Sequence, residues 1–164
     1  MPTATYVPLA TFTGSGTHAF TAIPQTYNHL VVVNHGIGTT AAENLVIQVG
    51  NGSYDANNNY TYRFNGTSSS STGVGAGSNA SCGGIFCGAI KNDYPNVSVT
   101  TILNYSSTSI QKNFITRNGG YSDSGQSNAI WVGQWITSGT AINQLKFTNT
   151  FAAGSTTTIY GLVA

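Results

Sequence analysis

Short runs of β-branched and aromatic residues, separated every few residues by Gly, Ser, Thr or Asn, extend along the whole chain. Strong helix formers are sparse, and the frequent Gly, Ser, Thr and Asn residues interrupt any helical repeat. Short strands at frequent intervals, bounded by turn residues, are typical of an all-β sandwich or barrel. The sequence therefore predicts strands at Tyr6–Thr13, Thr17–Ala22, His29–Ile37, Asn44–Val49, Tyr60–Asn65, Gly84–Ile90, Val97–Tyr105, Lys112–Arg117, Ala129–Thr137, Asn143–Asn149 and Thr156–Val163.

Turns between these strands are expected where glycine and asparagine supply positive backbone angles. They fall at Gly14–Gly16, Asn51–Gly52, Asn65–Gly66 and Asn118–Gly120. A low-complexity stretch rich in serine and glycine, at about residues 66–84, is predicted to be a long polar loop.

One compact domain is expected at 164 residues, with a core large enough to need no disulfide. Pro2 and Pro8 favour extended backbone around them. Residues 1–8 are therefore predicted to form an extended N-terminal arm, and residues 9–164 the β-sandwich domain.

The strand Val97–Tyr105 alternates cleanly between two kinds of side chain. Val97 and Val99 share one face, while Ser98 and Thr100 share the other, which is the pattern of a half-buried strand.

Two strands are apolar on both faces. In Ala129–Thr137, Trp131 and Trp135 share one face around Gly133 and aliphatic residues share the other, and His29–Ile37 has a similar pattern. Both faces then need cover, either from a loop folded over the outer face or from another subunit with the indoles as anchors. The candidate interface residues are Trp131, Trp135, Val31, Val33, Pro2, Tyr6 and Pro8.

Charged residues are scarce, with only five Lys and Arg and four Asp and Glu in the chain. Soluble domains typically carry about a quarter of their residues as charged side chains. A neutral polar surface costs little to desolvate because its groups can pair again across an interface. The composition therefore predicts a protein packed against its own copies or a larger assembly. Nucleic acid is not an expected partner without a basic stripe, nor a membrane without an apolar run of about 18 residues.

Signals of enzymatic chemistry are close to absent, so we do not expect an enzyme. The sequence has no Gly-x-Ser-x-Gly elbow and no phosphate-binding loop. A glycosidase needs two carboxylates at a fixed separation, whereas the four acids are predicted in or beside loops without obvious pairing.

No metal site or cofactor is predicted either. Asp55, Asn57 and Asn59 match the opening of a calcium loop, but the following glycine and closing glutamate are missing. His29 and His35 share a strand face about 20 Å apart, too far to hold one metal without a bend. Cys82 and Cys87 could close a short disulfide loop, but two buried thiols are favoured since nothing indicates an oxidising compartment.

Several segments, read in order, carry a resemblance to a known family. They are Leu9-Ala10-Thr11-Phe12, Ile23-Pro24-Gln25-Thr26-Tyr27-Asn28-His29-Leu30, Tyr62-Arg63-Phe64-Asn65-Gly66, Asn104-Tyr105, Trp131-Val132-Gly133-Gln134-Trp135, Ala141-Ile142-Asn143-Gln144-Leu145 and Phe151-Ala152-Ala153-Gly154-Ser155-Thr156-Thr157-Thr158-Ile159-Tyr160-Gly161. This order resembles a β-rich module recurrent in virion proteins of tailed bacteriophages, notably cyanophages and other aquatic phages.

The resemblance implies a jelly-roll-like antiparallel β-sandwich on a virion surface. Because the chain has no coiled-coil heptads, it is most similar to a free-standing capsid cement (decoration) protein, a class that is commonly trimeric. Such a protein would be made in the host cytoplasm and would bind the major capsid protein on the outer capsid surface. The alternative is a tail-fibre or tail-tip module that recognises a host surface glycan, for which exposed Tyr and Trp beside Asn would supply a platform.

Overall fold

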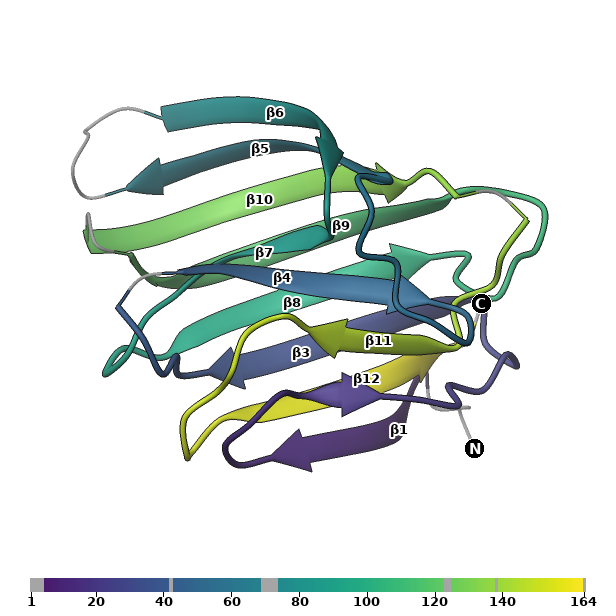
Figure 1. The fold of residues 1–164 in the computed structure, drawn as a ribbon, viewed down its shortest axis with the longest axis horizontal. Helices are drawn as coiled ribbons and strands as arrows, with labels where there is room; N and C mark the ends of the chain where they lie inside the picture. The colour runs from purple at the N-terminus through teal and green to yellow at the C-terminus, as the bar shows by residue number, and fades with distance from the viewer. Residues whose placement is uncertain (1–4, 42, 69–73, 123–124, 138, 164) are drawn as a thin grey trace.

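The computed structural model describes residues 5–41, 43–68, 74–122, 125–137 and 139–163, which fold into two antiparallel sheets packed face to face (Figure 1). No helix forms in these ranges, so none of them contains a helix that could cross a membrane. The predicted all-β sandwich is confirmed.

One sheet has eight strands in the order β1-β12-β3-β8-β9-β10-β5-β6, and the other has four in the order β2-β11-β4-β7. The strands are β1 (Tyr6–Thr13), β2 (Ala19–Phe20), β3 (His29–Gly36), β4 (Glu43–Gly50), β5 (Tyr60–Ser68), β6 (Val74–Cys82), β7 (Ile85–Ile90), β8 (Asn96–Leu103), β9 (Lys112–Ser122), β10 (Gly125–Trp135), β11 (Gln144–Phe147) and β12 (Thr156–Leu162).

Eight of these strands form a frame, made of β1-β12-β3-β8 in one sheet and β2-β11-β4-β7 in the other. This order is consistent with the jelly roll that the resemblance implies. The hairpins β5–β6 and β9–β10 add the remaining four strands to one sheet only, beyond β8. We call these four strands the extension; they occupy the upper part of Figure 1.

The core lies between the two sheets and is built from side chains that alternate along each strand. The eight-stranded sheet contributes Leu30, Val32, Ile102, Phe114 and Trp135, and the four-stranded sheet contributes Leu45, Ile47, Leu145 and Phe147. We call the face that points into this core the inner face of the eight-stranded sheet, and the opposite one its outer face.

All eleven predicted strands are present, but the loop predicted at about 66–84 is wrong over much of its length. Residues 74–82 form β6, which pairs with β5 through Phe64↔Gly77 and Asn65↔Ala76 among others. Ladder hydrogen bonds use only the backbone, so a segment without large apolar residues can still extend a sheet. Residues 69–73 lie outside the described ranges.

Two predicted turns are also wrong, since Asn65–Gly66 lies inside β5 and Asn118–Gly120 inside β9. These glycines allow close contact instead of a turn. A Cβ on Gly66 would lie 2.6 Å from the Cβ of Ala129, and one on Gly120 would lie 2.6 Å from Asn96 Nδ2.

The predicted N-terminal arm is partly strand. Tyr6, Val7 and Pro8 pair with β12 in the edge strand β1, so these residues belong to the sandwich. An edge position suits Pro8, which lacks the N–H that a central strand would need. Pro2 lies outside the described residues.

Candidate functional site

Over residues 97–100, strand β8 turns its polar side chains inward and its apolar side chains outward, whereas Ile102 points into the core. Ser98 and Thr100 are buried on the inner face, whereas Val97 and Val99 are exposed on the outer face. The alternation expected from the sequence is present. An antiparallel sheet with one solvated face usually shows the opposite orientation, with the apolar side chains inward.

Hydrogen bonds pair part of the polar layer inside the sandwich, while Asn96 Oδ1 and Asn118 Nδ2 are buried without a hydrogen-bond partner. Thr100 Oγ1 lies 2.8 Å from Thr116 Oγ1 and 3.3 Å from Cys87 Sγ, so each hydroxyl has a partner. Trp131 Nε1 donates to Asn118 Oδ1 at 2.9 Å. A buried polar group that is paired in this way loses most of the cost of leaving water.

The outer face of β8, β9 and β10 carries five exposed aliphatic side chains. Pairing places Val99 beside Arg117 and Arg117 beside Ile130, while Ile115 lies beside Val132. Side chains opposite each other on one sheet face are within contact reach. We call this set the docking face: Val97 (48% exposed), Val99 (37%), Ile115 (38%), Ile130 (49%) and Val132 (50%).

Polar and basic side chains border the docking face. Arg63 pairs with Val132 across to β5, and Gln134 Nε2 donates to Asn113 Oδ1 at 2.8 Å. A hollow of about 350 Å³ opens beside Ile130 and Arg117. Exposed apolar side chains together with arginine and a polar rim are features that many protein–protein interfaces share.

The predicted interface tryptophans lie on the inner face of β10. Trp135 is 2% exposed, and its Nε1 donates to Asp55 Oδ2 at 2.7 Å. Trp131 is half-buried and stacks with Phe64 and with Phe86, at centroid distances of 4.5 and 5.6 Å. The indole face of β10 is therefore covered by β7 of the same chain, and the face left uncovered carries Ile130 and Val132.

The other predicted interface residues lie on the outer face or at its edge. Val33 pairs with Val99 and extends the docking face toward β3, while Val31 is already buried there. Tyr6 and Pro8 are exposed on the edge strand β1, where the ring of Tyr6 meets that of Tyr160 edge to face at 6.4 Å.

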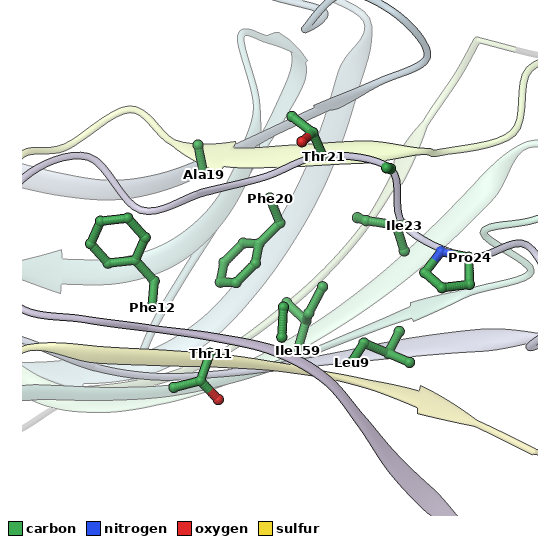
Figure 2. A pocket seen from close by; sticks show the side chains of 11 residues that line it. Leu9, Thr11, Phe12, Ala19, Phe20, Thr21, Ile23, Pro24 and Ile159 are labelled. Atoms are coloured by element: carbon green, nitrogen blue, oxygen red, sulfur yellow. The ribbon is translucent and has the colours of Figure 1, made fainter.

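An open apolar groove of about 370 Å³ separates the edge strands β1 and β2. Figure 2 shows Leu9, Phe12 and Ile159 on one side of it and Phe20 and Ile23 on the other. Phe20, Ile23 and Ile159 are members of the core, so this groove is the core's open edge.

A smaller polar cleft of about 340 Å³ lies at one end of the outer face. We call it the tyrosine cleft; it is lined by Tyr94, Pro95, Gly119, Gly120, Tyr121, Gln126 and Asn128. The sequence pointed only to Gly119 and Gly120 among these residues, and it placed both in a turn. The two tyrosines come from separate elements and show no shared local pattern.

The suspected calcium residues form a structural node around Asp55. Its carboxylate accepts hydrogen bonds from Trp135 Nε1, from Asn59 Nδ2 at 3.0 Å and from the Asn57 backbone at 2.9 Å. Burial alone would raise the pKa of this carboxyl, but these bonds outweigh burial and lower the pKa. Within the described ranges, no group of three His, Cys, Asp or Glu side chains could hold a metal ion.

The cysteines are two separate buried thiols. Burial raises the pKa of Cys87 to about 12 against the opposing effect of its hydrogen bonds, so its thiolate is scarce at neutral pH. The environment of Cys87 therefore does not favour a reactive thiol.

No protein-family model, curated protein or solved structure matches this chain.

Proposed function

We propose that this protein is a structural component of an assembly and acts by packing its docking face against other protein subunits. The observation that carries the proposal is that neighbouring parts of β8 and β9 bury Thr100 and Thr116 while they expose Val99 and Ile115. Exposed aliphatic side chains gathered on adjacent strands gain free energy when a partner removes them from water. The shortage of charge lowers the desolvation cost for the rest of the surface.

The resemblance to phage virion modules gives the proposal a specific form, a capsid cement protein. Such a protein, as a trimer, would bind the outer capsid surface where major capsid subunits meet. Because it would bind the assembled shell and not free subunits, its binding would stabilise the shell by mass action. Arg63 and Arg117 around the docking face favour a partner surface that carries acidic groups.

Location in the virion tests the cement role directly. Purified virions would be labelled with an antibody against this protein and imaged. Label distributed over the icosahedral head in many copies would support the cement role. Label confined to the tail or its tip would contradict it and support the tail-fibre alternative.

A paired substitution tests the docking face itself. Val99→Lys combined with Val132→Lys places two further cations beside Arg117 and Arg63, and the apolar contact is lost. We expect at least a tenfold loss of capsid occupancy or self-association. A tenfold loss corresponds to about 1.4 kcal/mol, which is less than the free energy gained by burying two valine side chains.

The matched control is Thr11→Lys with Thr13→Lys, two exposed positions on the edge strand β1. Both variants should keep the wild-type circular dichroism spectrum and melt cooperatively. Unchanged occupancy in the docking-face variant, measured by sedimentation with capsids, would contradict the proposal.

A further inference from the structure

The tyrosine cleft lies where the turn between β7 and β8 meets the β9–β10 hairpin, at the end of the sandwich where β8 and β10 begin (left in Figure 1). Tyr94 comes from the turn and is 44% exposed, and Tyr121 lies near the end of β9. Their rings stack at 4.5 Å with an angle of 19° between planes. The pair makes one wall of the cleft.

Backbone hydrogen bonds hold the turn that carries Tyr94. Lys91 and Tyr94 form an isolated β-bridge, which closes the turn. The N–H of Asn92 donates to Thr40 O at 2.8 Å, and the N–H of Gly38 donates to Lys91 O at 3.0 Å. The ring is thus positioned before any ligand arrives, which lowers the ordering cost of binding.

The floor of the cleft is low because Gly119 has no side chain there. In the sheet, Gly119 lies between Val97 of β8 and Asn128 of β10. A Cβ at Gly119 would lie 3.0 Å from Asn128 Oδ1 and would crowd the space between the amide and the rings.

Two neutral amide side chains, Gln126 and Asn128, stand exposed beside the aromatic wall. Neither side chain makes a hydrogen bond to the part of the chain that the structure describes. Each amide offers two N–H donors and a carbonyl acceptor. These groups can therefore bind a ligand without breaking an existing bond.

A pyranose sugar matches this combination of surfaces. Its C–H groups carry slight positive charge and can stack on the negative face of an aromatic ring, while its hydroxyls both donate and accept hydrogen bonds. None of the described residues that line the cleft is charged, and the nearby cation, Lys91 Nζ, lies 5.7 Å from the centre of the Tyr94 ring. The uncharged lining favours a neutral sugar. A volume near 340 Å³ lies at the small end of ligand sites, as one or two sugar units require.

We propose that the tyrosine cleft binds a neutral saccharide, with Tyr94 and Tyr121 as the stacking wall and Gln126 and Asn128 as hydrogen-bonding groups. This activity differs from the packing role of the docking face, which adjoins the cleft at Val97 and Asn128. It would give the chain a means of attachment to carbohydrate-bearing surfaces.

Binding would be tested on an array of neutral and acidic oligosaccharides, followed by NMR titration of the purified chain with the best neutral ligand. We expect neutral pyranosides to bind. Tyr94→Ala should weaken binding about tenfold, since an aromatic contact contributes on that order. Tyr94→Phe keeps the ring and should restore most of the affinity, and Asn128→Ala should weaken binding with the wall intact.

Tyr6→Ala is the matched control, because Tyr6 is also exposed but lies on the far edge strand β1. The docking-face variant Val99→Lys with Val132→Lys should retain saccharide binding, so failure of either proposal is distinguishable from failure of the other. The saccharide proposal is overturned if the wild-type chain binds no neutral saccharide, or if Tyr94→Ala binds as wild type does. Selective binding of acidic glycans or of a proline-rich peptide would overturn it too.

Discussion

Strands β3 and β4, within the frame, and strands β8 and β9, where the frame meets the extension, use the two faces of a sheet in opposite ways. Leu30, Val32 and Leu45 point inward in the frame, as the hydrophobic effect requires of a chain that folds alone. In β8 and β9, Thr100 and Thr116 point inward instead, and Val99 and Ile115 face solvent. The difference shows that alternation along a strand does not by itself tell which of its two faces is buried.

Strand β10 gives the strongest test of this contrast, because it carries a buried side chain on its inner face and exposed side chains on its outer face. Trp135→Ala should lower the free energy of unfolding by about 3–5 kcal/mol, because it empties a core site and removes a hydrogen-bond donor to Asp55. Val132→Thr, on the outer face of the same strand, should change it by about 0.5 kcal/mol or less. Urea unfolding of both variants provides the measurement, and similar losses would refute the assignment of the two faces.

The polar inner layer can be tested by a double-mutant cycle. Thr116→Val should cost about 1 kcal/mol, because it removes the 2.8 Å hydrogen bond to the Thr100 hydroxyl. Replacing both Thr100 and Thr116 by Val should cost clearly less than the sum of the two single changes, since no partner is then left unpaired. Additive losses would mean that the hydroxyl pair does not stabilise the layer.

His18 adds a pH dependence that belongs to the frame alone. Burial lowers the pKa of its imidazole against the opposing hydrogen bond to Gly14. The neutral ring can donate from Nε2 to Gly14 O at 3.0 Å and accept at Nδ1 from the Thr157 hydroxyl at 2.7 Å. As pH falls through the ordinary histidine value of 6.5, the unfolded chain binds a proton before the folded one does.

Stability should therefore be complete above that value and fall as the pH drops below it. Melting temperatures measured between pH 8 and pH 5 would show the fall, and His18→Gln should flatten it. His35→Gln is the control, because His35 is exposed on the outer face of β3. A slope that His18→Gln leaves unchanged would contradict this assignment.

The sequence predicted strand positions well because the alternation of apolar and polar residues and the glycine-rich segments between strands are local signals. It missed β6, whose pairing with β5 uses backbone groups and leaves no apolar pattern to read. It also could not show that Val97 and Val99 face outward. Alternation separates two faces, but which face is inside depends on partners from other strands, such as Thr116 and Cys87 for the Thr100 hydroxyl.

The candidate site was predictable only in part. The apolar pattern on both faces of Ala129–Thr137 is present in β10, where the chain's own β7 covers the indole face and Ile130 and Val132 stay exposed on the other. The stack of Tyr94 on Tyr121 depends on a turn and a strand that are brought together by sheet pairing. No spacing along the sequence records such a contact.

The extension has a consequence for how much of a surface each copy can shield. Four additional strands at a spacing of about 4.8 Å widen one sheet by about 19 Å, while the opposite sheet keeps its four strands. The extension makes the molecule broader without adding a further layer to it. If the broad sheet lies against a shell, fewer copies are needed to span each gap between shell subunits, and each copy adds little to the diameter of the particle.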